Sequence, residues 1–222
     1  MTVLPLTPDE LLTTTRSVRK RLDLARPVPI ELVTECLQIA LQAPSGSNSQ
    51  GWHWLVITAP ETRAAIGELY RRSTEAYLAV REREAREAAE RGEGPAPGSA
   101  EAQTMLRIRA SSSYLGQHMG EVPVQVIACI EVNGPWLASS QAGLWGSVLP
   151  AAWSYMLAAR ARQLGTAWTT LHLAYEKEAA EILGLPGNIR QGVLIPTAYY
   201  TGETFRPAPR RPAQEVMHLN HW

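Results

Sequence analysis

The spacing of apolar positions predicts helices over most of the chain. Residues 6–16 form a short helix, with Thr7 as the N-cap and Pro8 at the first helical position. Pro44 ends a clearer amphipathic helix over residues 30–42. The same reasoning predicts helices over residues 60–91, 100–118, 144–164 and 175–184.

Two of these helices carry patterns that predict how they pack. In the helix 30–42 we expect the buried face to consist of Ile30, Val33, Leu37 and Leu41. The helix 144–164 is apolar almost all round, so it is either central or half covered by a second subunit. Gly165 follows it directly and is expected to end it as a left-handed cap.

Short apolar, β-rich runs between the helices predict four strands, over residues 54–58, 122–132, 166–170 and 193–201. Gly and Pro residues make 92–98 a flexible loop, and prolines and arginines make 203–222 an extended arm. Neither half of the chain has a complete pattern of its own. We therefore expect a single domain over residues 1–222.

Composition and charge remove several classes of function. The 21 Lys and Arg residues balance the 21 Asp and Glu residues, which argues against a nucleic-acid-binding module and a polybasic membrane-surface protein. The two cysteines, Cys36 and Cys129, lie in apolar runs and are expected to be buried thiols, not a disulfide or zinc site. The chain opens without a signal-like apolar stretch, and its most apolar run, 122–132, is too short to span a bilayer. We therefore expect a soluble, cytoplasmic protein.

Three polar segments far apart in the sequence are candidates for ligand binding. Residues 15–19 place two guanidiniums beside hydroxyl groups, which suits a phosphate but also describes a solvated basic patch. Residues 43–52 crowd short amides and hydroxyls between a helix and a strand, where they form either a reader of a polar ring edge or an ordinary capped loop. In residues 207–212 prolines stiffen a segment with two arginines, which makes either a ligand-binding arm or a surface tail.

Other polar residues are weaker candidates. His218 and His221 have no acidic or Cys partner nearby, which disfavours a metal site. His118 and His172 follow apolar segments and fit a core or a pocket equally well. No serine lies in a Gly-x-Ser-x-Gly elbow, which disfavours a serine hydrolase.

Taken together and in this order, the three polar segments resemble the FMN-dependent nitroreductase family over nearly the whole chain. Residues 16–19 (Arg-Ser-Val-Arg) match its opening basic cluster. Residues 43–52 match its Ala-Pro-Ser-x-x-Asn-x-Gln-Pro-Trp motif, with Gly51 in place of the proline. Residues 157–168 match Leu-Ala-Ala-Arg-x-x-x-Leu-Gly-Thr-x-Trp, and residues 210–212 (Arg-Arg-Pro) match the basic residue near its C-terminus.

The resemblance implies an α+β fold in three α/β/α layers with a mainly antiparallel sheet, and an intertwined homodimer with FMN at the subunit interface. The implied function is an oxidoreductase that passes hydride from NADH or NADPH through flavin N5 to a small acceptor, such as a nitroaromatic or a quinone. The cycle would be ping-pong. The flavin carries the chemistry, so the resemblance implies no catalytic side chain and no metal.

The resemblance also implies the residues of the site. FMN would be held by Arg16, Ser17, Arg19 and Arg210 of one chain and by Pro44, Ser45, Gly46 and Asn48 of the other, with Gln50 in the same motif. Thr170 and Leu171 would offer backbone N–H groups near flavin N5, where some relatives have Glu-Gly. Arg19 is expected to stabilise negative charge at the N1 and O2 edge of the reduced flavin. Thr15 stands where the family often has Arg, which removes one possible phosphate contact.

Several functions remain compatible with this resemblance. The same fold and cofactor would serve dehalogenation, ene reduction or consumption of the flavin itself. A flavin-binding protein without enzymatic activity is a further alternative. Residues 75–105 cover the region that usually shapes the substrate pocket, so the sequence leaves the acceptor open.

Overall fold

One antiparallel sheet lies at the centre of the computed structural model, which describes residues 3–134 and 138–222. Its strands are β1 (Trp52–Ile57), β2 (Val124–Glu131), β3 (Leu164–Thr166) and β4 (Ile189–Tyr199). They lie in the order β1-β2-β4-β3, and each neighbouring pair is antiparallel. The α+β class and the mainly antiparallel sheet are thus as predicted.

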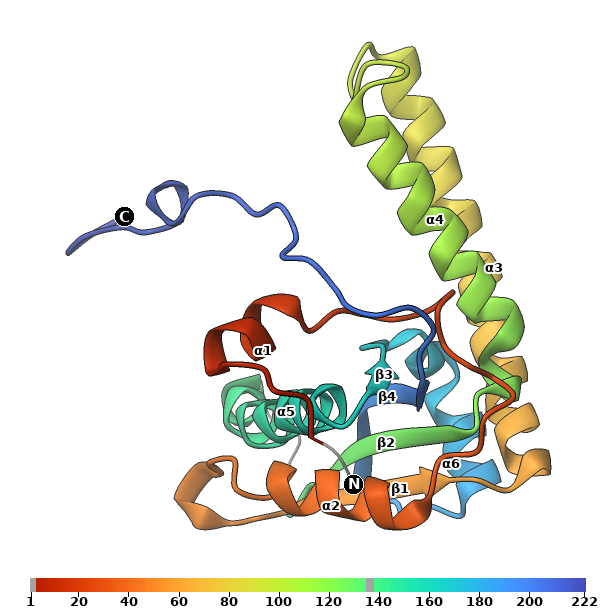
Figure 1. The fold of residues 1–222 in the computed structure, drawn as a ribbon, viewed down its shortest axis with the longest axis vertical. Coiled ribbons are helices and arrows are strands. Elements are labelled where there is room, and N and C mark those ends of the chain that lie inside the picture. Colours follow the sequence, from red (N-terminus) through yellow and green to blue (C-terminus); the bar gives the residue numbers. More distant parts are fainter. Residues whose placement is uncertain (1–2, 135–137) are drawn as a thin grey trace.

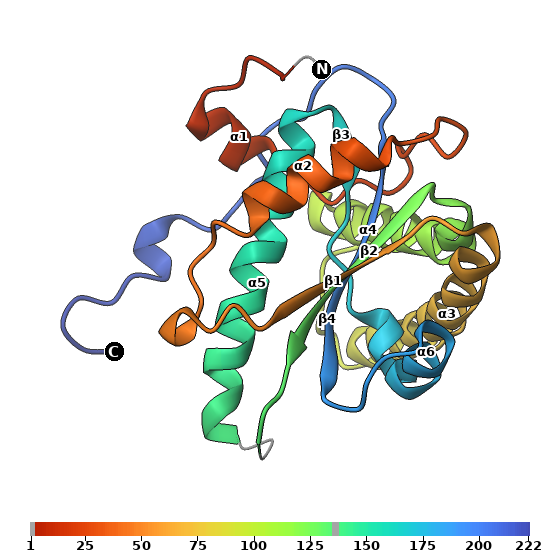
Figure 2. The same cartoon turned by 90° about the horizontal axis from the view of Figure 1, so that it is seen from below.

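Helices cover both faces of this sheet. In the described residues they are α1 (Pro8–Thr14), α2 (Ile30–Ala40), α3 (Pro60–Glu90), α4 (Ala100–His118), α5 (Ala138–Ala161) and α6 (Glu176–Leu183). α2 and α5 lie on one face, and α3 and α6 lie on the other (Figures 1 and 2). The arrangement has the three α/β/α layers that the sequence predicts.

The central strand β2 shows why both faces are covered. Val126 and Ala128 point into the core under α2 and α5, whereas Ile127 and Cys129 point into the core under α3 and α6. Successive side chains of a strand alternate between faces, so a run that is apolar at nearly every position needs a layer on each side. The prediction of buried thiols is confirmed, and burial raises the pKa of Cys36 to about 11 and that of Cys129 to about 12.

The end of α5 differs from the prediction. The residue in the left-handed region is Gln163, with φ of 64°, and Gly165 lies inside β3. The chain turns before the glycine because β3 already begins at Leu164 and pairs with Tyr199. Gly165 instead allows close packing, since a Cβ there would stand 3.1 Å from the side chain of Val18. The predicted cap and the predicted strand 166–170 were both placed too late in the chain.

The buried face of α2 also differs from the prediction. Ile30 is 48% exposed and Leu41 is 40% exposed, although both were expected to be buried. The residues that α2 buries are Leu32, Val33, Cys36 and Ala40. These residues form one stripe of the helix that packs against α5, and the apolar side chains of Ile30 and Leu41 lie outside it.

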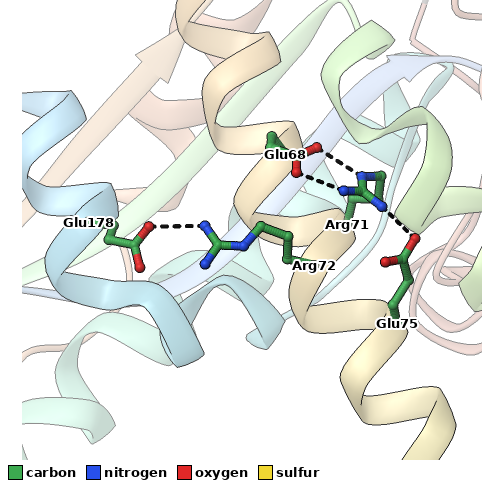
Figure 3. Close-up of polar contacts among 5 residues, drawn as sticks. All are labelled: Glu68, Arg71, Arg72, Glu75 and Glu178. Atoms are coloured by element: carbon green, nitrogen blue, oxygen red, sulfur yellow. Dashed lines mark hydrogen bonds and ion pairs between the residues drawn. The ribbon is translucent and has the colours of Figure 1, made fainter.

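Helices α3 and α4 form an antiparallel hairpin that projects from the body (Figure 1). At its base Arg71 pairs with Glu68 and Glu75 on the same helix, and Arg72 reaches Glu178 of α6 at 3.1 Å (Figure 3). These side chains are largely exposed, so solvent screens the ion pairs and they contribute little to stability. None of the described helices combines the length and the hydropathy that crossing a bilayer requires.

Candidate functional site

The basic segment predicted from the sequence is fixed on the sheet by one buried residue. The amide of Val18 donates to the carbonyl of Thr166 at 2.7 Å, and its side chain is 4% exposed. Ser17 forms an isolated bridge with the same residue of β3. Because Val18 points inward, its neighbours on either side are held toward the surface, where Ser17 is exposed and Arg19 is partly exposed.

Arg16 ties together two remote parts of the chain. Its Nε and Nη2 donate to the carbonyl of Arg206 at 3.2 and 2.9 Å. Its Nη2 also donates to the carbonyl of Thr13 at 2.7 Å, and its Nη1 donates to that of Thr15 at 2.9 Å. These bonds occupy every N–H of the guanidinium except one on Nη1. Arg16 therefore fastens the C-terminal arm to the end of α1 and keeps one donor free.

A second guanidinium approaches the first. Partial burial and the positive charge of Arg210 lower the pKa of Arg16 from its ordinary value. In the described part of the chain neither arginine forms an ion pair with a carboxylate, and Nη1 of Arg210 donates to the carbonyl of Pro209 at 2.9 Å. Two cations held together without an acid attract an anion, and guanidiniums suit phosphate or carboxylate oxygens.

Arg19 lies on the other side of Ser17 and faces α3. Its charge acts on the hydroxyl of Tyr70, whose pKa is nonetheless raised because burial outweighs that effect. Among the described residues the guanidinium of Arg19 has no hydrogen-bond or ion-pair partner. Its guanidinium is therefore available to a ligand.

The segment predicted to offer backbone N–H groups lies next to β4. The amide of Thr169 donates to the carbonyl of Leu194 at 3.1 Å, and Thr170 that follows is exposed. The carbonyl of Leu171 accepts from Ser73 of α3 at 2.6 Å, which holds the segment in place. Within residues 3–134 and 138–222, the amide of Leu171 has only a long contact of 3.5 Å, with the hydroxyl of Thr169.

The loop that carries the second motif is held by α5. The hydroxyl of Ser147 accepts from the amide of Gly46 at 2.9 Å and donates to the carbonyl of Gly143 at 2.8 Å. Inside the loop the hydroxyl of Ser45 accepts from the amide of Gln50 at 3.1 Å, and the side chain of Gln50 donates to that of Asn48 at 3.0 Å. Ser47, Asn48 and Gln50 have φ between 50° and 53°, so the loop is tightly wound, and Pro44 precedes it as an exposed residue. A pocket of about 340 Å³ adjoins it, lined in part by Glu131 and Leu144.

The predicted site residues therefore fall into two separate groups. Arg16, Ser17, Arg19, Thr170, Leu171 and Arg210 belong to the first group, around β3 and the start of the arm. Residues 44–50 belong to the second, against Ser147 in the first half of α5. The end of α5 at Ala161 lies roughly 20 Å from Ser147 along the helix, at 1.5 Å per residue. One chain does not bring the two groups together.

Sequence reasoning missed several residues that build the first group. The hydroxyls of Tyr70 and Thr169 bond to each other at 3.0 Å beside Thr170. Arg21 and Gly202 fix the start of the arm, where the guanidinium of Arg21 donates to the carbonyl of Thr201 at 2.6 Å. Gly202 itself is a sequence signal for this turn, because glycine adopts the positive φ that is observed there.

Comparison with known proteins finds the same fold in several flavoproteins. A BluB-like flavoprotein from Clostridium difficile 630 matches with a TM-score of 0.68 and 17% identity, over 96% of this chain and 99% of that one. The FMN and NADPH-dependent nitroreductase NfnB from Sphigopyxis sp. strain HMH matches with a TM-score of 0.66 and 21% identity, over 98% and 100%. An iodotyrosine deiodinase bound to FMN and 3-iodo-L-tyrosine matches with a TM-score of 0.65 and 20% identity, over 96% and 98%. At such identities the likeness establishes the fold.

The structural matches establish the fold, and a family model establishes the family. It is described as the nitroreductase family, and it matches residues 12–199. The match spans most of the chain and includes both groups of candidate residues except Arg210, so this chain belongs to the nitroreductase family.

Proposed function

We propose that this chain is an FMN-dependent oxidoreductase that passes hydride from NADH or NADPH to a small acceptor, such as a nitroaromatic or a quinone. Family membership supports the class of reaction, and solved structures of the same fold are named as FMN-bound or FMN-dependent. FMN, when bound, supplies the hydride-accepting and hydride-donating N5 atom. The protein has to bind it, orient it and leave one face open.

The observation that carries the proposal is that Arg210 lies close enough to Arg16 for its charge to lower the pKa of Arg16, while in the described residues neither arginine has an acidic partner. A phosphate ester would supply the missing negative charge. Most N–H groups of Arg16 already donate to backbone carbonyls, so Arg16 would offer the phosphate its charge and one N–H. Arg210 would offer more N–H donors than Arg16. The exposed hydroxyl of Ser17 completes the set.

The remaining residues of the first group would orient the ring. Arg19, which has no partner among the described residues, would face the N1 and O2 edge and stabilise negative charge there. The amides of Thr170 and Leu171 would face N5, and the bond from Ser73 to the carbonyl of Leu171 holds that segment still. No side chain is assigned a catalytic proton.

A second copy of the chain would complete the site. The motif residues Pro44, Ser45, Gly46, Asn48 and Gln50 lie far from Arg16 in their own chain, so they would serve the partner's flavin. The helix α5 leaves Trp153 37% exposed and Leu149 and Leu157 partly exposed, and these are one turn apart on one face. We propose that this face forms the homodimer interface.

The alternative keeps the fold and FMN but changes the reaction to dehalogenation, ene reduction or consumption of the flavin. A flavin-binding protein without enzymatic activity is the other alternative. One solved structure of this fold is named a deiodinase and another a nitroreductase, so the fold by itself does not choose between these two reactions.

Spectroscopy on the purified protein tests the proposal directly. FMN should bind at about one per chain, with quenching of flavin fluorescence, and anaerobic NADH or NADPH should bleach the yellow protein. Addition of a nitroaromatic or a quinone should then restore the colour. A protein that binds FMN but is bleached only by dithionite would favour the alternatives. A protein that fails to take up FMN would refute the proposal.

A further inference from the structure

The side chain of Arg21 ties the chain that leaves β4 to the N-terminal segment. The Nε of Arg21 donates to the carbonyl of Thr201 at 2.6 Å, and its Nη1 donates to the carbonyl of Thr204 at 3.1 Å. In return the amide of Thr201 donates to the carbonyl of Arg21 at 2.8 Å. One guanidinium therefore fixes both ends of the turn 201–204.

Gly202 is the residue that lets the turn close around this guanidinium. Its φ is +81°, which L side chains rarely adopt. A Cβ at this position would stand 2.7 Å from Nη2 and 3.3 Å from Cζ of Arg21. Nε and Nη1 of the same guanidinium are bonded to two carbonyl groups, so a shift of Arg21 away from the methyl group would strain those bonds.

Two aromatic rings and a second arginine complete this arrangement. The ring centroids of Tyr200 and Phe205 lie 4.9 Å apart, and Cζ of Arg21 lies 4.3 Å from the centroid of Phe205. Arg160, 3% exposed, donates to the hydroxyl of Tyr200 at 2.7 Å, and its Cζ lies 5.0 Å from the centroid of Phe205. In the described residues neither arginine pairs with a carboxylate, so ring faces and oxygens offset their charge. We call Arg21, Arg160, Tyr200, Gly202 and Phe205 the clasp.

The clasp sets the direction of the arm just before Arg210. The residue after Phe205 gives its carbonyl to Arg16, so the chain is fixed through Arg206. The next three residues are Pro-Ala-Pro, and such a segment is extended and stiff, at about 3.1 Å per residue. A direction fixed at Arg206 is therefore transmitted over roughly 12 Å of backbone to Arg210.

We propose that the clasp is a positioning device that holds Arg210 in place for the phosphate of FMN. The proposal rests on the proposed function, because it takes FMN as the ligand of Arg210. Clasp residues act through the arm and are not themselves contacts of the phosphate. The clasp residues order the arm before FMN binds. The arm therefore loses less conformational entropy on binding.

Two substitutions should open the clasp, one by adding a steric clash and the other by removing contacts. Gly202→Ala places a methyl group against Arg21, and Arg21→Lys keeps the charge but loses the two-pronged contact and the planar stacking. Gly184→Ala is the matched control for the first, because Gly184 has φ of +63° and open space around it. Arg26→Lys is the control for Arg21→Lys. Arg26 also stacks on an aromatic ring, with its Cζ 3.5 Å from the ring centroid of Tyr199, but it lies outside the clasp.

The first readout needs no FMN. Chymotrypsin cleaves after Phe205, whose ring is packed in the clasp, so cleavage of the FMN-free protein at this bond reports an open clasp. Gly202→Ala and Arg21→Lys should raise the cleavage rate about tenfold, and both controls should leave it unchanged. If Gly202→Ala does not fold, as judged by circular dichroism, Arg21→Lys carries the test. Equal cleavage in wild type and Arg21→Lys would overturn the clasp.

The second readout is the FMN dissociation constant in a double-mutant cycle with Arg210→Ala. Arg21→Lys and Gly202→Ala should each weaken FMN binding about tenfold in the wild-type background and less than twofold in the Arg210→Ala background. An equal loss in both backgrounds, or no loss in the first, would overturn the positioning role. A wild-type protein that binds no FMN would instead refute the proposed function, and the chymotrypsin readout would separate the two failures.

Discussion

The hydroxyls of Tyr70 and Thr169 lie 3.0 Å apart and join α3 to the segment that precedes Thr170. Both residues are buried, at 2% and 9% exposure. Burial raises the pKa of Tyr70, so its hydroxyl stays protonated at physiological pH. The hydroxyl of Ser73, which is also on α3, donates to the carbonyl of Leu171. Together the two hydrogen bonds fix residues 169–171 against α3.

Tyr70→Phe should therefore destabilise the protein without changing its shape. The substitution removes one hydroxyl and leaves that of Thr169 with one partner fewer, which costs about 1–2 kcal/mol of unfolding free energy. Urea unfolding measures the loss as a lower midpoint at unchanged slope. Tyr77→Phe is the control, because Tyr77 is 45% exposed and should lose nothing measurable. Equal midpoints for wild type and Tyr70→Phe would show that the hydroxyl pair adds no stability.

Much of the architecture could be predicted from local patterns. The helix over residues 175–184 is observed as α6, Glu176–Leu183, and Gly184 ends it with φ of +63°. Here the signal is local, because a glycine directly after a periodic segment is favoured in the left-handed region. The same rule failed at Gly165, where pairing of Leu164 with Tyr199 decides the conformation. Long-range pairing is not encoded in the neighbouring residues.

The motifs of the candidate site could be predicted from the sequence, but the residues that hold these motifs in place could not. The basic segment and the loop 43–52 were visible because their polar residues are contiguous. Ser147, which holds the amide of Gly46, stands alone in an apolar helix and carries no such signal. The occupation of Arg16 by three carbonyl groups is likewise a tertiary feature, since one of them belongs to Arg206 at the far end of the chain.

His172 should make the protein sensitive to acid. It is fully buried, neither ring nitrogen has a hydrogen-bond partner among the described residues, and burial lowers its pKa from 6.5 to about 4, against a smaller opposing effect of Glu176. As the pH falls through 6.5, His172 takes up a proton in the unfolded chain. In the folded chain it stays neutral until the pH approaches about 4. Stability is thus lost between pH 6.5 and pH 4, by up to about 3 kcal/mol.

His172→Gln removes this titration and should flatten the dependence of the urea midpoint on pH in that window. Parallel midpoint curves for wild type and His172→Gln would contradict the assignment of the acid sensitivity to this ring.

Trp153→Glu should separate the proposed dimer. Trp153 is 37% exposed in the middle of α5, and a carboxylate there would have to be desolvated at a subunit contact. Sedimentation at micromolar concentration should show a monomer that binds FMN at least tenfold more weakly, because the loop 44–50 of the partner is lost. Ile182→Glu, at a position 42% exposed on α6, is the control and should remain dimeric. A dimeric Trp153→Glu would place the interface elsewhere.

Arg210→Ala should weaken FMN binding and little else. A charge-assisted contact contributes about 1.5–3 kcal/mol, so the dissociation constant should rise roughly ten- to hundredfold. In protein saturated with FMN the rate of reduction by NADH or NADPH should change little, because the phosphate is remote from the reacting atoms. Arg211→Ala is the control, since Arg211 is the exposed neighbour. An equal loss of affinity in Arg211→Ala would point to general electrostatic attraction and away from a specific contact.

Arg19→Ala should change the potential of the bound flavin and not chiefly its affinity. Arg19 has no partner among the described residues, and a cation at the N1 and O2 edge stabilises the reduced, negatively charged form more than the oxidised form. Loss of about 1.5–3 kcal/mol from the reduced form alone lowers the two-electron midpoint potential by roughly 30–60 mV. Reduction by NADH or NADPH should slow accordingly, even at saturating FMN. Lys20→Ala, at the exposed neighbour, is the control, and equal midpoint potentials in wild type and Arg19→Ala would remove Arg19 from the flavin edge.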